Sequence, residues 1–69
     1  MAYAQQVPVP PPLPVGKIKS FGPVGEQYEV LRALRQLADG DWMVEIRLVA
    51  TGERAEYRLQ RVLDDPEAR

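Results

Sequence analysis

The fold is decided by the stretch DGDWMVEIRLVATGERAEY, which spans Asp39–Tyr57 of this 69-residue chain. Its central part alternates in character, with apolar residues at every second position and Glu45 and Arg47 between them. The apolar series consists of Trp42, Val44, Ile46 and Leu48. Because successive side chains of a strand point to opposite faces, the pattern predicts a strand with one apolar face. Trp42 is its largest member, so we expect it in the core.

Two glycine-containing dipeptides bound this strand, Asp39-Gly40 before it and Thr51-Gly52 after it. Glycine reaches positive φ without a Cβ clash, which is why such dipeptides are typical of hairpin turns. The stretch therefore predicts antiparallel neighbours on both sides. If Thr51-Gly52 is a two-residue loop, the next strand is registered by opposite charges and runs on until Pro66 ends it. The expected pairs are Val44–Leu59, Ile46–Tyr57, Glu45–Arg58 and Arg47–Glu56.

The preceding segment, Tyr28–Leu37, is ambiguous. Leucines at positions 31, 34 and 37 fit one stripe of a helix. No N-cap residue precedes Tyr28, however, and Asp39-Gly40 lies where a hairpin loop belongs. As a strand, the segment would turn Leu31, Ala33 and Leu37 toward the face of Trp42. Its remaining apolar residues, Tyr28, Val30 and Leu34, would then lie on the opposite face.

The N-terminal third divides into an arm and a first strand. Most of the prolines fall in residues 1–15, which we expect to form an extended proline-rich arm, with residues 16–69 as the small β domain. The sequence GKIKSF, Gly16–Phe21, alternates weakly, and Lys17 and Lys19 suit an edge strand. The predicted fold class is mainly β, a small antiparallel meander of three to four strands. The alternative is an α+β fold with Tyr28–Leu37 as a helix packed on a hairpin.

Composition excludes several kinds of site. The chain has no Cys and no His, so disulfides, ordinary zinc sites and the commonest nucleophile and general base are all missing. We therefore expect no enzyme, no catalytic residues, no metal and no cofactor. Net charge is −1, which does not favour nucleic acid, and no apolar run is long enough to span a bilayer. A cytoplasmic protein is expected.

Four motifs resemble those of a family of small uncharacterised bacterial proteins, classed as a domain of unknown function. They are SFGPVGEQYEVL (Ser20–Leu31), DGDWMVEIRLVATGE (Asp39–Glu53), EYRL (Glu56–Leu59) and LDDPEA (Leu63–Ala68). The resemblance covers Gly16 to Ala68 and not the arm. It implies a strand for Tyr28–Leu37, because the family often carries proline at the position of Ala33 and glycine at Leu31-Arg32. It implies no activity, cofactor or catalytic residue.

Two function classes remain. A thin sheet with a second apolar face needs a partner to cover it, which predicts a protein-interaction module, either a homodimer or a companion of a second bacterial protein. The candidate interface consists of Tyr28, Val30, Leu34, Met43 and Val49. The alternative is a nucleic-acid-binding module in which arginines and the aromatic rings of Trp42 and Tyr57 share one sheet face.

Overall fold

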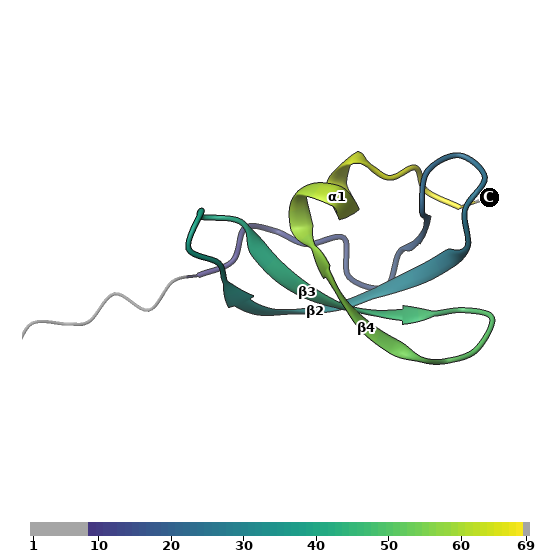
Figure 1. Cartoon of the computed structure of the whole chain (residues 1–69), viewed down its shortest axis with the longest axis horizontal. Coiled ribbons are helices and arrows are strands. Elements are labelled where there is room, and N and C mark those ends of the chain that lie inside the picture. Colours follow the sequence, from purple (N-terminus) through teal and green to yellow (C-terminus); the bar gives the residue numbers. More distant parts are fainter. Residues whose placement is uncertain (1–8, 69) are drawn as a thin grey trace, which may run out of the picture.

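The sheet is an antiparallel meander of four strands followed by one short helix (Figure 1). The structure, a computed structural model, describes residues 9–68. Its elements are β1 (Ile18–Ser20), β2 (Gln27–Gln36), β3 (Trp42–Leu48), β4 (Arg54–Arg58) and α1 (Leu59–Asp64). Sheet order follows chain order, so each strand pairs with the next. The predicted mainly β meander is confirmed, and the helical alternative for Tyr28–Leu37 is wrong.

The leucine spacing that suggested a helix belongs to a doubly bulged strand. β2 pairs with β3 along most of its length, but the register shifts once between Val30 and Arg32 and again between Ala33 and Arg35. The residues left out of the ladder at these shifts are Leu31 and Leu34. Each bulge adds one residue to β2 without adding one to β3. The leucines at the two bulges are therefore three residues apart, which is also the spacing of apolar residues along one side of a helix.

The length of the β2–β3 loop corrects the predicted faces of β2. Tyr28 lies opposite Leu48 and Val30 lies opposite Ile46. Residues directly opposite each other share a face, so Tyr28 and Val30 lie on the face of Trp42. The prediction that they lie on the other face is wrong. It assumed a two-residue loop at Asp39-Gly40, but Leu37 N–H donates to Asp41 O at 2.7 Å, so the loop is one residue longer and the register shift of one reverses both faces. The two bulges reverse the alternation twice, so their effects on Tyr28 and Val30 cancel.

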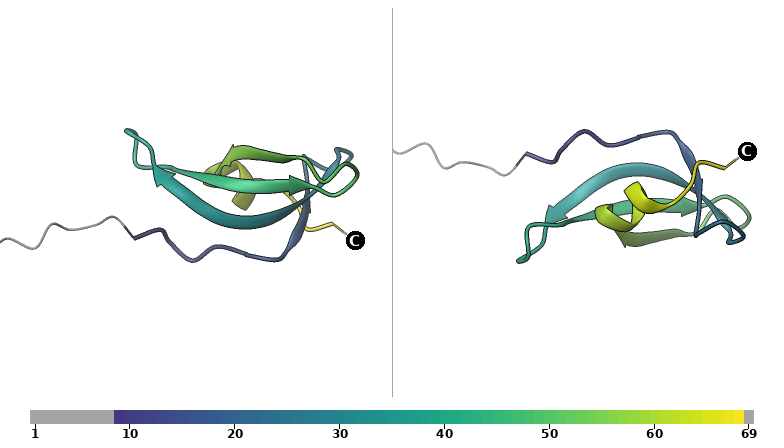
Figure 2. Two further views of the ribbon diagram at one scale, coloured as in Figure 1. Left: turned by 90° about the horizontal axis from the view of Figure 1, so that it is seen from below. Right: turned by 90° about the horizontal axis from the view of Figure 1, so that it is seen from above.

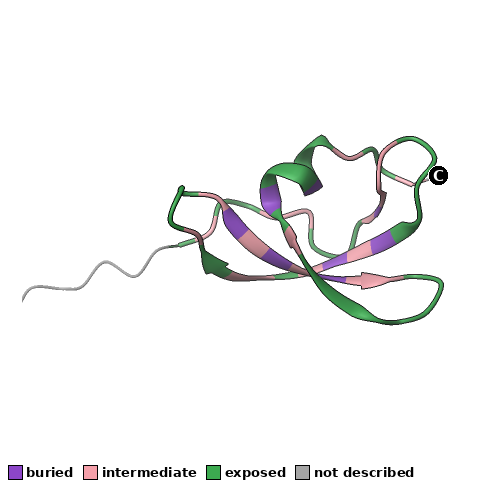
Figure 3. Cartoon of the chain, in the orientation of Figure 1, coloured by how far each residue is buried: buried purple, intermediate pink, exposed green. Residues whose placement is uncertain are grey.

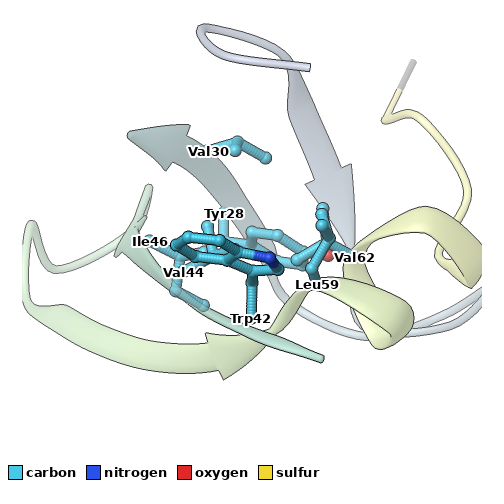
Figure 4. Packing of buried hydrophobic residues seen from close by; sticks show 7 residues of the cluster. All are labelled: Tyr28, Val30, Trp42, Val44, Ile46, Leu59 and Val62. Atoms are coloured by element: carbon cyan, nitrogen blue, oxygen red, sulfur yellow. The ribbon is translucent and has the colours of Figure 1, made fainter. Parts of the chain in front are cut away.

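One face of the sheet carries the core. Seven buried residues form a single cluster, and α1 lies against the same face (Figures 2 and 4). The residues of this core cluster are Tyr28, Val30, Trp42, Val44, Ile46, Leu59 and Val62. Trp42 is 8% exposed, which confirms its predicted place in the core. Leu13 of the preceding segment also packs against this cluster, and Gly16 N–H donates to Val30 O at 2.9 Å, so this segment runs beside β2. Residues 1–8 of the predicted arm lie outside the described residues.

The β3–β4 hairpin has a longer loop than predicted. Leu48 N–H donates to Glu53 O and Gly52 N–H donates to Leu48 O, each at 2.8 Å, which makes residues 49–52 the loop. Val44 therefore lies opposite Tyr57, and Ile46 opposite Ala55. The predicted register is wrong by two residues, because the loop has four residues instead of two. A shift of two leaves every side chain on its predicted face.

The chain after β4 is helical, which corrects the expectation of a strand running to Pro66. Leu59 and Val62, three residues apart, point into the core from α1. The Asp41 side chain, from the β2–β3 turn, accepts a hydrogen bond from Gln60 N–H at 3.3 Å and so satisfies one free donor of the first helical turn. Burial of two apolar residues on one side favours this single turn over a longer strand. No helix in residues 9–68 is long and apolar enough to cross a bilayer.

Candidate functional site

The face of the sheet opposite the core, here called the outer face, is bare. Within residues 9–68, α1 and the segment before β1 do not lie over it, and the left view of Figure 2 looks directly onto the strands. The register places nine side chains on this face, three from each of β2, β3 and β4. They are Glu29, Arg32, Arg35, Met43, Glu45, Arg47, Arg54, Glu56 and Arg58.

Ion pairs cross the outer face from strand to strand. Arg47 lies 2.6 Å from Glu29 between β3 and β2. Glu45 of β3 contacts arginines on both sides, Arg32 at 3.1 Å and Arg54 at 3.7 Å. Exposed pairs of this kind contribute only about 0.2–1 kcal/mol each. They fix the positions of the guanidinium groups more than they stabilise the fold.

Met43 lies between further arginines. It is opposite Arg35 on β2 and opposite Arg58 on β4. Arg35 also reaches past β3 to Glu56 on β4, at 2.8 Å. Arg58 turns toward the β2–β3 turn and lies 2.6 Å from Asp39. This hydrogen bond from Arg58 lowers the pKa of the Asp39 carboxyl below its ordinary value.

The outer face carries excess positive charge. Five arginines and three glutamates give it a formal charge of +2, whereas the whole chain has −1. The remaining residues are therefore net acidic. A half-buried methionine within an arginine-rich surface has the composition typical of protein interfaces, where Met and Arg are enriched.

The five predicted interface residues do not share one surface. Tyr28 and Val30 are fully buried in the core, so a partner cannot contact them without opening it. Met43 lies on the outer face, while the half-buried Leu34 sits at the second bulge of β2. Val49 is 43% exposed in the β3–β4 loop. Three of the five residues thus remain accessible or partly accessible, and only Met43 lies among the arginines.

The aromatic rings and the sheet arginines lie on opposite faces. Trp42 is in the core, and Tyr57 packs against it. Tyr57 also meets Phe21 and Tyr28 edge-on, with ring centroids 5.1 and 5.6 Å apart. No strand in the described part of the chain offers arginines and aromatic rings on one face, which is the arrangement that the nucleic-acid alternative required.

The Asp41 carboxylate, in the β2–β3 turn, has structural partners. Asp41 Oδ1 accepts from Trp42 N–H at 2.7 Å, and its Oδ2 lies 3.6 Å from Arg58. A groove of about 390 Å³ runs beside Asp41, between the β2–β3 turn and α1. Among residues 9–68, no three His, Cys, Asp or Glu side chains are grouped so that they could hold a metal ion.

A family model described as a family of unknown function (DUF5397) matches residues 5–69 of the chain. The chain belongs to the DUF5397 family. An uncharacterised protein of Haemophilus influenzae is 46% identical over 56 residues, which is 81% of this chain and 89% of that relative. The resemblance seen in the motifs is confirmed. The match begins at residue 5, so the DUF5397 region also includes most of the proline-rich arm that the motifs left out.

The sequence did not predict two long-range contacts of this DUF5397 chain. Lys19 is only 7% exposed, and its Nζ donates to Val62 O at 2.7 Å and Asp65 O at 2.9 Å, at the end of α1. Asp65 also accepts from Tyr28 Oη–H at 2.6 Å and Gly22 N–H at 3.2 Å. The LDDPEA motif contains this aspartate, but nothing in the local pattern identifies partners more than 35 residues away.

Proposed function

We propose that this DUF5397 chain is a small, non-catalytic protein-interaction module whose outer face contacts another protein. The observation that carries the proposal is the bare outer face, on which Met43 lies among five arginines. The opposite face already has α1 and Leu13 packed over it, and needs no partner. The partner is a second protein in the cytoplasm or another copy of the chain. The absence of Cys and His supports a non-catalytic role.

The arginines support contact with protein better than contact with nucleic acid. Each of the five lies within 4 Å of a carboxylate of the same chain, so the face alternates in sign instead of forming a positive stripe. Nucleic-acid binding generally depends on a one-signed surface, and single strands also need rings for stacking. A protein surface of mixed charge can match an alternating face pair by pair.

Met43→Glu tests the proposal. The change removes the apolar centre of the face, and its carboxylate can pair with neighbouring arginines, so folding should persist. Val24→Glu is the matched control, because Val24 is 97% exposed in the β1–β2 loop and the charge change is the same. The wild-type chain and Val24→Glu should retain a stoichiometric protein partner on purification from the native host. Met43→Glu should bind that partner roughly tenfold less tightly, which corresponds to about 1.4 kcal/mol.

The thermal melt of each variant shows that it is folded. Equal recovery of the partner by Met43→Glu and Val24→Glu would overturn the role of the outer face. Nucleic acid recovered in place of a protein would favour the alternative.

A further inference from the structure

The two edges of the sheet differ. At the β1 edge, the C-terminal residues form an isolated antiparallel bridge between Glu67 and Lys19, in which Ser20 N–H donates to Pro66 O at 3.0 Å and Ala68 N–H donates to Ile18 O at 2.8 Å. At the other edge is β4, which pairs with β3 alone. No described residue pairs with the outer side of β4, and Figure 2 shows it at the margin of the sheet. An unpaired strand edge is a template for another strand.

The backbone of β4 is oriented for such pairing. Leu48 N–H donates to Glu53 O, and in an antiparallel ladder successive residues direct their backbone groups alternately to the two neighbours. Residues 53, 55 and 57 therefore face β3. Arg54, Glu56 and Arg58 direct N–H and C=O away from the sheet. Every residue of β4 except Tyr57 is exposed (Figure 3).

The side chains of Arg54, Glu56 and Arg58 favour a particular partner strand and a particular register. Along the outer face they read Arg54, Glu56, Arg58, a self-complementary order. If two copies pair antiparallel about Ala55, each Arg54 lies opposite Glu56 of the second copy, which gives two opposite-charge pairs. Pairing about Glu56 sets glutamate against glutamate and Arg54 against Arg58. Pairing about Tyr57 also gives two opposite-charge pairs, Glu56 with Arg58, but it sets Ala55 and Arg54 against Leu59 and Gln60, which are already helical.

We propose that two copies of this chain pair along β4, with Ala55 on the two-fold axis. The sheets then join into one of eight strands, and their outer faces become continuous. The proposal specifies the self-association that the proposed function allows, but it uses the β4 edge. It fails or succeeds separately from the role of Met43.

A single introduced cysteine tests the register, because the chain has no cysteine of its own. At the two-fold axis the two Ala55 residues form a non-hydrogen-bonded pair, whose Cα atoms lie about 4.5 Å apart, within the range that a disulfide spans. Ala55→Cys should form a covalent dimer under mild oxidation at micromolar concentration. Glu56→Cys would do so if Glu56 were on the axis. Val24→Cys, also at an exposed position but in the β1–β2 loop, measures random collision.

Charge reversal tests the pairing itself. Arg54→Glu should weaken the dimer about tenfold in sedimentation equilibrium, because both cross-strand pairs become repulsive. The double variant Arg54→Glu/Glu56→Arg should restore it, provided that melts show all variants folded. Cross-linking of Ala55→Cys no faster than that of Val24→Cys would overturn the proposal, and so would failure of the double variant to recover. Neither result would bear on partner capture through Met43.

Discussion

At the scale of single residues, Tyr28 and Asp65 join β2 to the end of α1. The Tyr28 ring stacks on Phe21 with centroids 4.5 Å apart, and its hydroxyl donates to the Asp65 carboxylate at 2.6 Å. Burial first, and then this hydrogen bond, raise the pKa of Tyr28 well above its ordinary value of 10.0. The tyrosine therefore keeps its proton in the folded chain at a pH where the unfolded chain loses it.

This difference predicts alkaline sensitivity that Tyr28→Phe removes. Above pH 10 the unfolded state binds fewer protons than the native state, so the free energy of unfolding falls as pH rises, by up to about 1.4 kcal/mol per pH unit for this group. Tyr28→Phe should lower stability at pH 7 by about 1–3 kcal/mol, through the lost bond to a charged acceptor. Its stability should then decline less steeply between pH 10 and 11. Urea melts across this range measure both effects, and parallel curves would contradict the assignment.

At the scale of elements, the ladder of β2, β3 and β4 depends on bulges and loop length. The predicted pairs Glu45–Arg58 and Arg47–Glu56 do not form, because the four-residue loop moves β4 by two positions. Arg47 pairs with Glu29 on β2 instead. Charge complementarity alone did not determine the register. Opposite charges are frequent enough on this face to suit more than one alignment.

A pair of double-mutant cycles distinguishes the two registers. Substituting alanine at Glu29 and Arg47 should reveal a coupling of about 0.2–1 kcal/mol, because these residues are directly opposite and only partly exposed. The same cycle at Glu45 and Arg58 is the control, and should show almost no coupling. Denaturant melts give both values. Strong coupling between Glu45 and Arg58, with none between Glu29 and Arg47, would instead support the register with a two-residue loop.

At the scale of the whole molecule, the C-terminal segment closes the fold onto its first strand. Lys19 of β1 donates to carbonyl oxygens at the end of α1, and the bridge between Lys19 and Glu67 lies beside it. A charged amine at a helix C-terminus satisfies free carbonyls and interacts favourably with the helix dipole. The buried Lys19 thus connects β1 to two carbonyl groups that lie 43 and 46 positions further along the sequence.

Lys19→Met should therefore destabilise the domain by about 1–3 kcal/mol, because it keeps the apolar stem but leaves a buried carbonyl oxygen (Val62) and a partly buried one (Asp65) without their donor. Lys17→Met is the matched control. Lys17 is exposed two residues earlier, and its loss should change stability by less than about 0.5 kcal/mol. Thermal melts at neutral pH compare the two variants. Equal effects would mean that the amine at position 19 does not stabilise the helix end.

Much of the sheet follows from the sequence alone. Alternation over Trp42–Leu48, with glycine-containing turns on both sides, determined β3, its buried face and its antiparallel neighbours. For the ambiguous segment Tyr28–Leu37, the family resemblance favoured a strand over a helix. These features are local, because side-chain alternation and glycine's access to positive φ act within a few residues.

The tertiary structure decided what depends on distant contacts. The β2–β3 loop is one residue longer than predicted, which places Tyr28 and Val30 in the core and removes two residues from the predicted interface. The helical turn after Arg58 forms because Leu59 and Val62 can be buried against the sheet. Lys19 was predicted as a charge on an edge strand, but its amine donates to a carbonyl oxygen at the end of α1. In each case the free energy comes from burial or pairing with residues far along the chain, and local sequence preference is weaker than such contacts.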